Sequence, residues 1–327
     1  MKKIDTHCHI RYLEYQKELE KRGFATGTSG AAGEETSTKD WKEYAEARIA
    51  NMDRLDIERQ VLACPGYSPS LLADDEFNLY WVQASNDFLA QFCQKHPDRF
   101  SGFVGVPLFD VNLAIDELKR ATKAQGMVGV VLSSHLGRLM LDSQQLMPFY
   151  EEVNKMGLTI LIHPSLPIGF DEIEEYQQFS NLYKFIGYLF DSTMAVTRMV
   201  YRGIFEKYEN INLIASHLGG ILPFVCHSID IMWEQNVIDG EETPPKPPSE
   251  YFRRFYADTA RPLKAATLQC AIALYGEEHI LFGSDMPNWV EEFNAPERII
   301  STIEALDLPV IMKENIFYEN ARRLFNL

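Results

Sequence analysis

The alternation of short apolar or β-branched runs with segments of helical periodicity is the feature that most restricts the fold of this sequence. Each run is bounded by polar or turn residues, and apolar residues recur at helical spacing in most of the segments between the runs. Repeated strand and helix units build parallel sheets, and eight units predict a closed (β/α)8 TIM barrel of the α/β class. The expected strands are 3–6, 60–63, 102–106, 129–132, 158–162, 212–215, 255–258 and 280–283.

The length of 327 residues fits one such barrel, because this fold usually takes about 250 residues plus insertions. We therefore expect a single domain over residues 1–327, with loop insertions near 11–40, 164–190 and 236–250. The first two follow strands, so they would lie on the face where barrel active sites form. The third contains a proline-rich segment and is expected to be a rigid spacer on the other face.

Charge and cysteine content narrow the class of partner. The formal net charge is -16, which repels nucleic acid and anionic membranes, and we find no local basic patch in the sequence. The five cysteines have no paired spacing, which favours free thiols in the cytoplasm. No apolar stretch is long enough for a signal segment or a membrane span. We expect a cytoplasmic protein that binds a small molecule.

Two histidines at the end of the first expected strand point to a metal site. Strand alternation puts His7 and His9 on the same side, about 6 to 7 Å apart along the chain, and Cys8 on the other side. A His-x-His pair alone is also common in proteins that bind no metal. Further imidazole and carboxylate groups follow later strands, at a barrel mouth where core packing does not require them, and together these positions favour a metal site. They are His163, His217 and Asp285.

Four motifs in chain order resemble the amidohydrolase superfamily. They are Asp-Thr-His-Cys-His, Ile-His-Pro, Ser-His-Leu-Gly-Gly and Phe-Gly-Ser-Asp-Met-Pro. The similarity covers nearly the whole chain and is closest to the branch of 2-amino-3-carboxymuconate-6-semialdehyde decarboxylase. It implies a mononuclear metal site at the C-terminal face and catalytic roles for His217, an acid/base, and Asp285. The implied metal ligands are His7, His9, His163 and Asp285.

Three imidazoles and one carboxylate leave room on a divalent ion for water or substrate, as in catalytic sites. Zinc is the expected ion, and manganese is the alternative because these ligands do not select strongly between the two.

Two positions concern the substrate. Arg48 matches an arginine that holds a substrate carboxylate in the resembling branch, and the alternative is an arginine on a helix surface. In decarboxylases of the branch another substrate-binding arginine follows the sixth-strand histidine by eleven positions, and this chain has Ser228 there. An anionic group of the substrate would then be held differently or be absent. The sequence does not determine the oligomeric state, and a homodimer is consistent with the resemblance.

The resembling branch contains non-oxidative decarboxylases of hydroxylated aromatic or muconate-type acids together with hydratases and hydrolases. We expect a decarboxylase in which Asp285 protonates the carbon that bears the carboxylate and His217 orients a substrate oxygen. The alternative is a hydrolase of an amide, lactone or C–C bond, in which a hydroxide on the ion attacks a carbonyl and Asp285 accepts the proton. A non-catalytic barrel is disfavoured, because none of the site residues is lost.

Overall fold

The protein is seen in a computed structural model that describes residues 1–10, 12–22, 41–64, 75–137, 139–165, 182–261, 264–287 and 294–327. The expected insertions near 11–40 and 164–190 lie largely outside the described residues. Within the described part, no helix is both long enough and apolar enough to cross a membrane.

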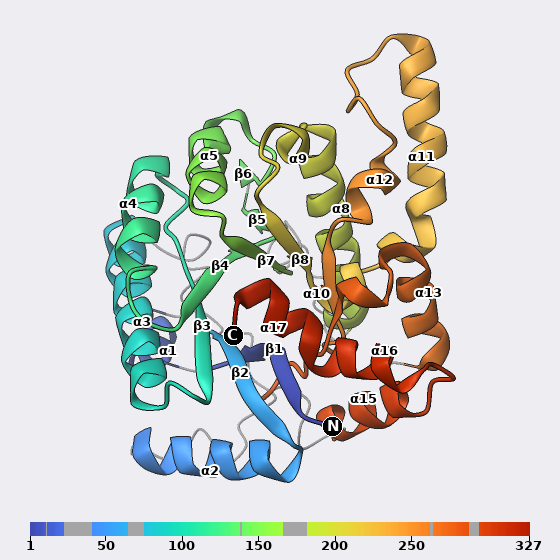
Figure 1. The fold of residues 1–327 in the computed structure, drawn as a ribbon. Helices are drawn as coiled ribbons and strands as arrows, with labels where there is room; N and C mark the ends of the chain where they lie inside the picture. Colours follow the sequence, from blue (N-terminus) through green and yellow to red (C-terminus); the bar gives the residue numbers. More distant parts are fainter. Residues whose placement is uncertain are drawn as a thin grey trace.

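Eight parallel strands form a barrel, as expected from the sequence (Figure 1). Neighbouring strands pair in the order β1, β2, β3, β4, β7, β8, β9, β10. The barrel closes between β1 and the end of β10, because the Thr6 amide donates to the Phe282 carbonyl and the Asp285 amide donates to the His7 carbonyl. The strands are β1 (Lys3–His9), β2 (Ile57–Ala63), β3 (Phe100–Val104), β4 (Met127–Ser133), β7 (Thr159–His163), β8 (Asn212–Ala215), β9 (Tyr256–Asp258) and β10 (Ile280–Leu281).

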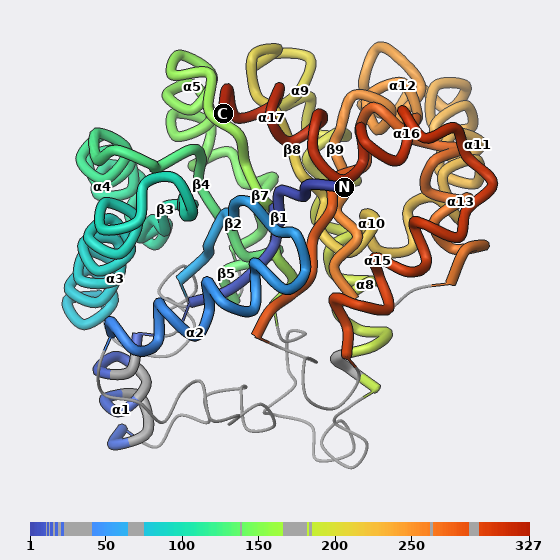
Figure 2. Tube along the Cα trace, turned by 60° about the horizontal axis from the view of Figure 1, so that its bottom comes forward, coloured from blue at the N-terminus to red at the C-terminus, as the bar shows by residue number. Residues whose placement is uncertain are grey.

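Helices surround the barrel, with α3, α4 and α5 on one side and α11 and α13 on the other (Figure 2). Local signals in the sequence set several of their ends. The Asp110 carboxylate accepts hydrogen bonds from two amides of the first turn of α4, and Gly157 ends α5 in a left-handed conformation. The main helices are α2 (Trp41–Arg54), α3 (Asp75–Lys95), α4 (Val111–Ala121), α5 (Met147–Met156), α8 (Tyr188–Tyr201), α11 (Leu222–Asp239), α13 (Ala265–Tyr275), α15 (Ala295–Glu304) and α17 (Asn320–Phe325).

Shorter elements join these helices and strands. They include one helix, α1, within the segment near 11–40 that was expected to be a loop. Tyr15 of α1 is buried against Phe77 of α3, which gives this amphipathic segment a surface to fold on. The short elements are α1 (Leu13–Lys21), the hairpin β5 (His135–Leu136) and β6 (Leu139–Met140), α9 (Ile204–Lys207), α10 (Ser216–Gly219), α12 (Pro248–Phe252), α16 (Val310–Glu314), and single turns at Gln144–Leu146, Tyr183–Gly187, Glu277–His279 and Asn315–Glu319.

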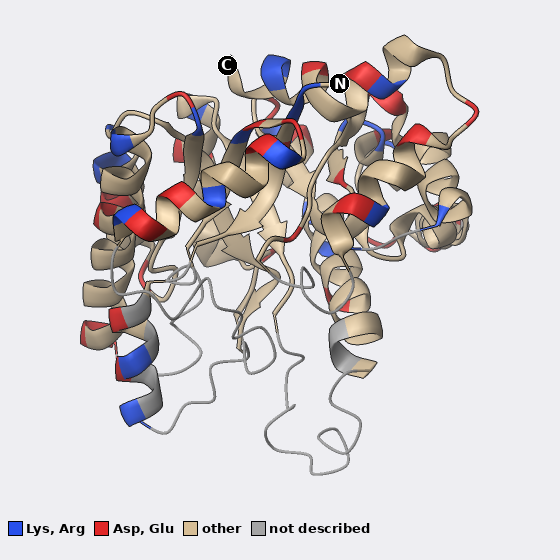
Figure 3. Cartoon of the chain, turned by 90° about the horizontal axis from the view of Figure 1, so that it is seen from below, with Lys and Arg blue, Asp and Glu red and all other residues tan. Residues whose placement is uncertain are grey.

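Two apolar cores determine which end of the barrel is open. A large core lies between the strands and the outer helices, and a smaller one fills the interior near the N-terminal ends of the strands. The interior core takes alternate residues of successive strands, such as Ile4, Val61 and Phe103, and Phe325 of α17 packs on Phe103. Both chain termini lie at this end, and Lys, Arg, Asp and Glu spread over the outer helices (Figure 3). The functional site therefore has to lie at the opposite end.

A register shift in β1 decides which of its side chains face the interior. Asp5 is opposite Gln60, but Cys8 is opposite Leu62, so β1 contains one extra residue between these pairs. Without the extra residue, Cys8 would share the interior face with Ile4. With it, Cys8 belongs to the outer core, and His7 and His9 face the interior.

Candidate metal centre

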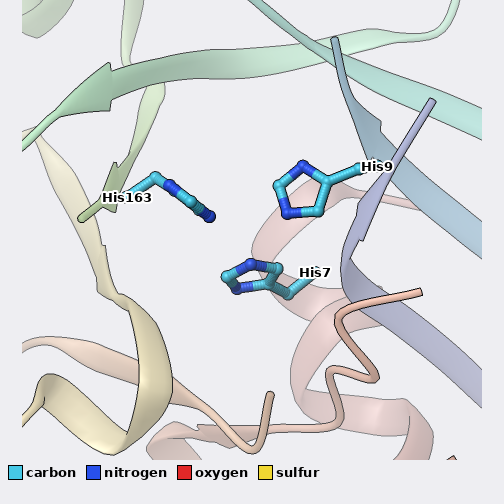
Figure 4. Close-up of side chains that lie close together, drawn as sticks. All are labelled: His7, His9 and His163. Carbon is cyan, nitrogen blue, oxygen red and sulfur yellow. The ribbon is translucent and has the colours of Figure 1, made fainter. Parts of the chain in front are cut away.

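Three imidazoles converge at the C-terminal mouth of the barrel, which is the end where the strands finish. His7 and His9 come from β1, and His163 comes from the last position of β7 (Figure 4). The ring centroids of His7 and His9 are 5.3 Å apart, and His163 lies 5.3 Å from His7 and 5.0 Å from His9. One ligand nitrogen from each ring lies within 4.8 Å of the others. The structure thus brings together the three histidines that the sequence predicts as ligands.

Hydrogen bonds set which ring nitrogen of each histidine is turned toward the others. Nδ1 of His7 lies 2.8 Å from Oδ2 of Asp258, so it donates to that carboxylate and leaves Nε2 as the nitrogen that can face an ion. Nδ1 of His163 lies 2.9 Å from the carbonyl oxygen of Pro164 and donates to it in the same way. Among the described residues, Nε2 of His7 is buried and has no hydrogen-bond partner. A buried ring nitrogen without a hydrogen-bond partner is the position that a metal ion would take in such a site.

Asp285, in the segment that follows β10, and His217, in α10 directly after β8, complete the cluster. Oδ1 of Asp285 lies 3.2 Å from Nε2 of His9 and 3.8 Å from Nε2 of His7. Its other oxygen, Oδ2, lies 3.9 Å from Nε2 of His217. Both residues have left-handed backbone conformations, with φ of 61° for Asp285 and 56° for His217. Such conformations are costly for residues with a side chain, and their presence in two site residues indicates that the surrounding structure holds the site in shape.

Burial and neighbouring charges shift the pKa values of these groups in ways that suit metal binding. Burial lowers the pKa of His9, and burial together with the nearby imidazoles holds the pKa of His163 well below its ordinary value. Burial and the charge of Arg261 lower the pKa of His217 to about 4. Burial alone would raise the pKa of Asp285, but the neighbouring imidazoles of His217 and His9 hold it well below its ordinary value. Neutral imidazoles and an ionised carboxylate are the forms that bind a cation.

His7 differs from the other imidazoles because it is paired with a carboxylate. Burial would lower its pKa, but the charge and hydrogen bond of Asp258 raise it to about 9. The same pair lowers the pKa of Asp258 against the effect of burial. Without a bound ion, Asp258 is therefore ionised and His7 is protonated at neutral pH. A divalent ion would displace the proton on Nε2, while Asp258 keeps the proton on Nδ1.

This donor set fits one divalent ion. Imidazole nitrogens and a carboxylate oxygen are the ligands preferred by zinc and are also accepted by manganese. One ligand atom from each of His7, His217 and Asp285 also lies within 4.8 Å of the other two, which places His217 beside the same site.

Comparison with known proteins identifies the family. The amidohydrolase family matches residues 4–327. The chain belongs to this family. It is 26% identical to a 2-amino-3-carboxymuconate-6-semialdehyde decarboxylase of Dictyostelium discoideum, over 99% of this chain and 92% of the relative. It is 29% identical to a gamma-resorcylate decarboxylase of Polaromonas, over 88% and 91% of the two chains.

A solved structure supports the same assignment. It is a dihydroxybenzoic acid decarboxylase from Polaromonas with bound manganese and the inhibitor 2-nitroresorcinol. Its TM-score to this chain is 0.82 at 25% identity, and the match covers 100% of this chain and 97% of the other. This amidohydrolase is therefore an enzyme of a metal-dependent family, with a TIM barrel as its fold.

Arg48 has surroundings that the sequence did not reveal. It lies on α2 but is only 2% exposed, so the interpretation as a helix-surface arginine is wrong. Its Nε donates to Oε1 of Gln60 at 2.6 Å, and one terminal nitrogen donates to the His9 carbonyl and the Tyr44 hydroxyl. Gln60 in turn donates to Asp5, which accepts from Ser284 beside Asp285. These contacts tie α2 to the backbone of the site, and a direct contact of Arg48 with substrate stays a prediction.

Two residues of the amidohydrolase site were missed in the sequence. Asp258 ends β9, and it accepts hydrogen bonds from the amides of His217 and Ala260 in addition to that from His7. Its position at a strand end is the signal that could have found it. Arg261 follows three residues later and acts electrostatically on His217 and Asp285. No comparable pattern in the sequence distinguishes this arginine.

His135 is buried in the short strand β5. Its Nε2 lies 3.8 Å from Oδ1 of Asp191 on α8.

Proposed function

We propose that this amidohydrolase is a metal-dependent, non-oxidative decarboxylase of a small hydroxylated aromatic or muconate-type carboxylic acid. The observation that carries the proposal is the convergence of His7, His9 and His163 with Asp285 and His217 at one barrel mouth. Two relatives are named as decarboxylases of such acids, and this supports the proposed substrate class.

The proposed metal ligands are His7, His9, His163 and Asp285. A bound divalent ion would supply positive charge that holds the substrate carboxylate and stabilises charge developing on the substrate. We propose zinc as the resident ion and manganese as the alternative, because the ligands suit both.

Asp285 is proposed to transfer the proton that replaces the carboxylate. Because the neighbouring imidazoles hold it ionised, Asp285 first has to accept a proton, from a hydroxyl group of the substrate or from water. It then delivers this proton to the carbon that bears the carboxylate. The C–C bond to the carboxylate breaks, its electron pair stays with the substrate carbon skeleton, and carbon dioxide leaves.

His217 is proposed to act beside the ion as a hydrogen-bonding group. Its ring lies 5.0 Å from that of His7, and its backbone amide is anchored to Asp258. Because its pKa is lowered to about 4, it is neutral at physiological pH and can donate one N–H to a substrate oxygen. This orients the substrate relative to Asp285.

The test is an assay of protein loaded separately with zinc and with manganese. Hydroxybenzoates, including 2,6-dihydroxybenzoate, and carboxymuconates are assayed for release of carbon dioxide, and lactones and amides are assayed for hydrolysis. Carbon dioxide release that is lost on chelation and restored by one of the two ions is the expected result. Hydrolysis without carbon dioxide release would refute the decarboxylase proposal in favour of the hydrolase alternative, which uses the same residues.

We also propose that the protein forms a homodimer. The helix α11 projects from the body of the barrel (Figure 1), and it carries exposed apolar side chains such as Phe224 and Ile238, which are 86% and 78% exposed. Exposed apolar surface of this kind is typical of a protein interface. Light scattering coupled to size exclusion is expected to give twice the chain mass, and Phe224→Glu is expected to lower it to the monomer mass.

A further inference from the structure

Arg261 lies at the rim of the mouth, in the segment that follows β9. Hydrogen bonds hold the start of this segment in place. Oδ1 of Asp258 accepts a hydrogen bond from the Ala260 amide at 3.1 Å and another from the His217 amide at 2.9 Å. One carboxylate oxygen therefore joins the backbone that precedes Arg261 to the backbone of a proposed catalytic residue. Arg261 is thus placed by the same group that positions His217 and His7.

The backbone of Arg261 is held in an unfavourable conformation. Its φ of 94° lies in a region that residues with side chains rarely adopt, as do the φ values of His217 and Asp285. Residues kept in such conformations concentrate at sites where the position of the side chain matters for function.

Two aromatic rings define where the guanidinium group lies. The Arg261 Cζ is 5.5 Å from the ring centroid of Phe185 and 5.7 Å from that of Tyr188, at the start of α8. Cation–π contacts with aromatic faces hold a guanidinium group in place and leave the N–H donors at its edge free to bond elsewhere. Planar, paired donors of this kind match the two oxygens of a carboxylate.

The charge of Arg261 interacts electrostatically with His217 and Asp285 in the site. It is one of the causes that lower the pKa of His217, and the charge of Asp285 acts on Arg261 in turn. The buried carboxylates of Asp258 and Asp285 together offset the charge of one divalent ion. A positive group at the rim then favours an anionic substrate over a neutral molecule of the same shape.

We propose that Arg261 is a substrate-binding residue, whose guanidinium group, held over the rings of Phe185 and Tyr188, pairs with an anionic oxygen of the substrate acid. This inference rests on the proposed function, because it requires the substrate to be an anion. Arg261 then determines specificity for acids, and it does so within the same chain that carries the metal site.

The experiment measures binding by calorimetry to metal-loaded, full-length protein. The probes are 2,6-dihydroxybenzoate and resorcinol, which has the same ring and hydroxyl groups but lacks the carboxylate. Arg261→Met is expected to weaken binding of the acid by at least about tenfold, as for loss of a charge-assisted hydrogen bond, and to leave resorcinol binding within about twofold. Arg261→Lys, which keeps the charge but not the fork of donors, is expected to fall between wild type and Met.

A matched control is Arg253→Met, because Arg253 is an exposed arginine at the other end of β9 and bonds to Ser249. It is expected to bind both probes like wild type. Metal content and the melting temperature of each variant are measured alongside.

Each other outcome overturns the inference in a distinct way. If Arg261→Met binds the acid as tightly as wild type, Arg261 does not contact the substrate, and the proposed function is unaffected. If both probes weaken equally, or if metal is lost, Arg261 has a structural role instead. If wild-type protein binds none of a panel of hydroxybenzoates and carboxymuconates, the proposed substrate class is wrong and the Arg261 inference fails with it.

Discussion

Replacing Asp285 with Asn separates the two roles proposed for this residue. The two carboxylate oxygens face different neighbours, with Oδ1 toward His9 and His7 and Oδ2 toward His217. An amide has nearly the same shape, so its oxygen can remain on the side of the metal ligands while its NH₂ group faces His217. Asparagine can still offer an oxygen to a cation, but it cannot accept and deliver a proton.

The expected effect is therefore large on turnover and smaller on metal content. A positioned proton carrier is typically worth about 10²- to 10⁴-fold in rate, so we expect Asp285→Asn to lower kcat by at least about 100-fold. At about 1.4 kcal/mol for each factor of ten, this corresponds to a barrier higher by roughly 3 kcal/mol. A substantial share of the metal is retained, because three imidazole ligands are unchanged.

The assay combines elemental analysis of the purified variants with initial rates of carbon dioxide release. Two further variants serve as controls. His217→Asn is expected to keep the metal, since His217 lies beside the proposed ion, and His163→Ala is expected to lose metal and activity together. An Asp285→Asn enzyme that is fully loaded with metal and turns over near the wild-type rate would refute the proton-transfer role.

Three other predictions follow from contacts around the site. Arg48→Met leaves the buried acceptors on Gln60, His9 and Tyr44 without their donor, so we expect the free energy of unfolding in urea to fall by about 3 kcal/mol or more. Unchanged stability together with a raised KM would instead support a direct contact between Arg48 and the substrate. Asp258→Asn removes the charge that holds the proton on Nδ1 of His7, and metal affinity in a chelator competition should fall by about 10- to 100-fold. Unaltered affinity would show that the pair of His7 and Asp258 does not contribute to metal binding. Gly283→Ala would place a Cβ 2.8 Å from that of His7 and 3.1 Å from that of Asp258. We expect this overpacking to cost about 1–3 kcal/mol of stability, seen as a lower melting temperature, and to weaken metal binding. A variant with the wild-type melting temperature and metal affinity would contradict this prediction.

The fold could be predicted from the sequence because its signals are local. Each expected strand is present, since an apolar run between turn residues is recognisable without knowledge of its neighbours. The positions of His163, His217 and Asp285 followed from the same signals, because parallel strands all end at one mouth. Helix α1 was missed because its stability comes from packing of Tyr15 against α3, a contact that the sequence does not display.

By itself, then, the sequence determined the barrel and the set of imidazole and carboxylate groups that meet at its mouth. Only the tertiary structure decided how these groups are supported and what else joins them. The extra residue in β1 turns His7 and His9 inward, but it is visible only as a shift in pairing with β2. Likewise, Arg48 became a buried anchor and Arg261 a member of the site through contacts with residues distant in the chain. Periodicity reports on one element at a time, whereas these roles depend on how several elements pack together.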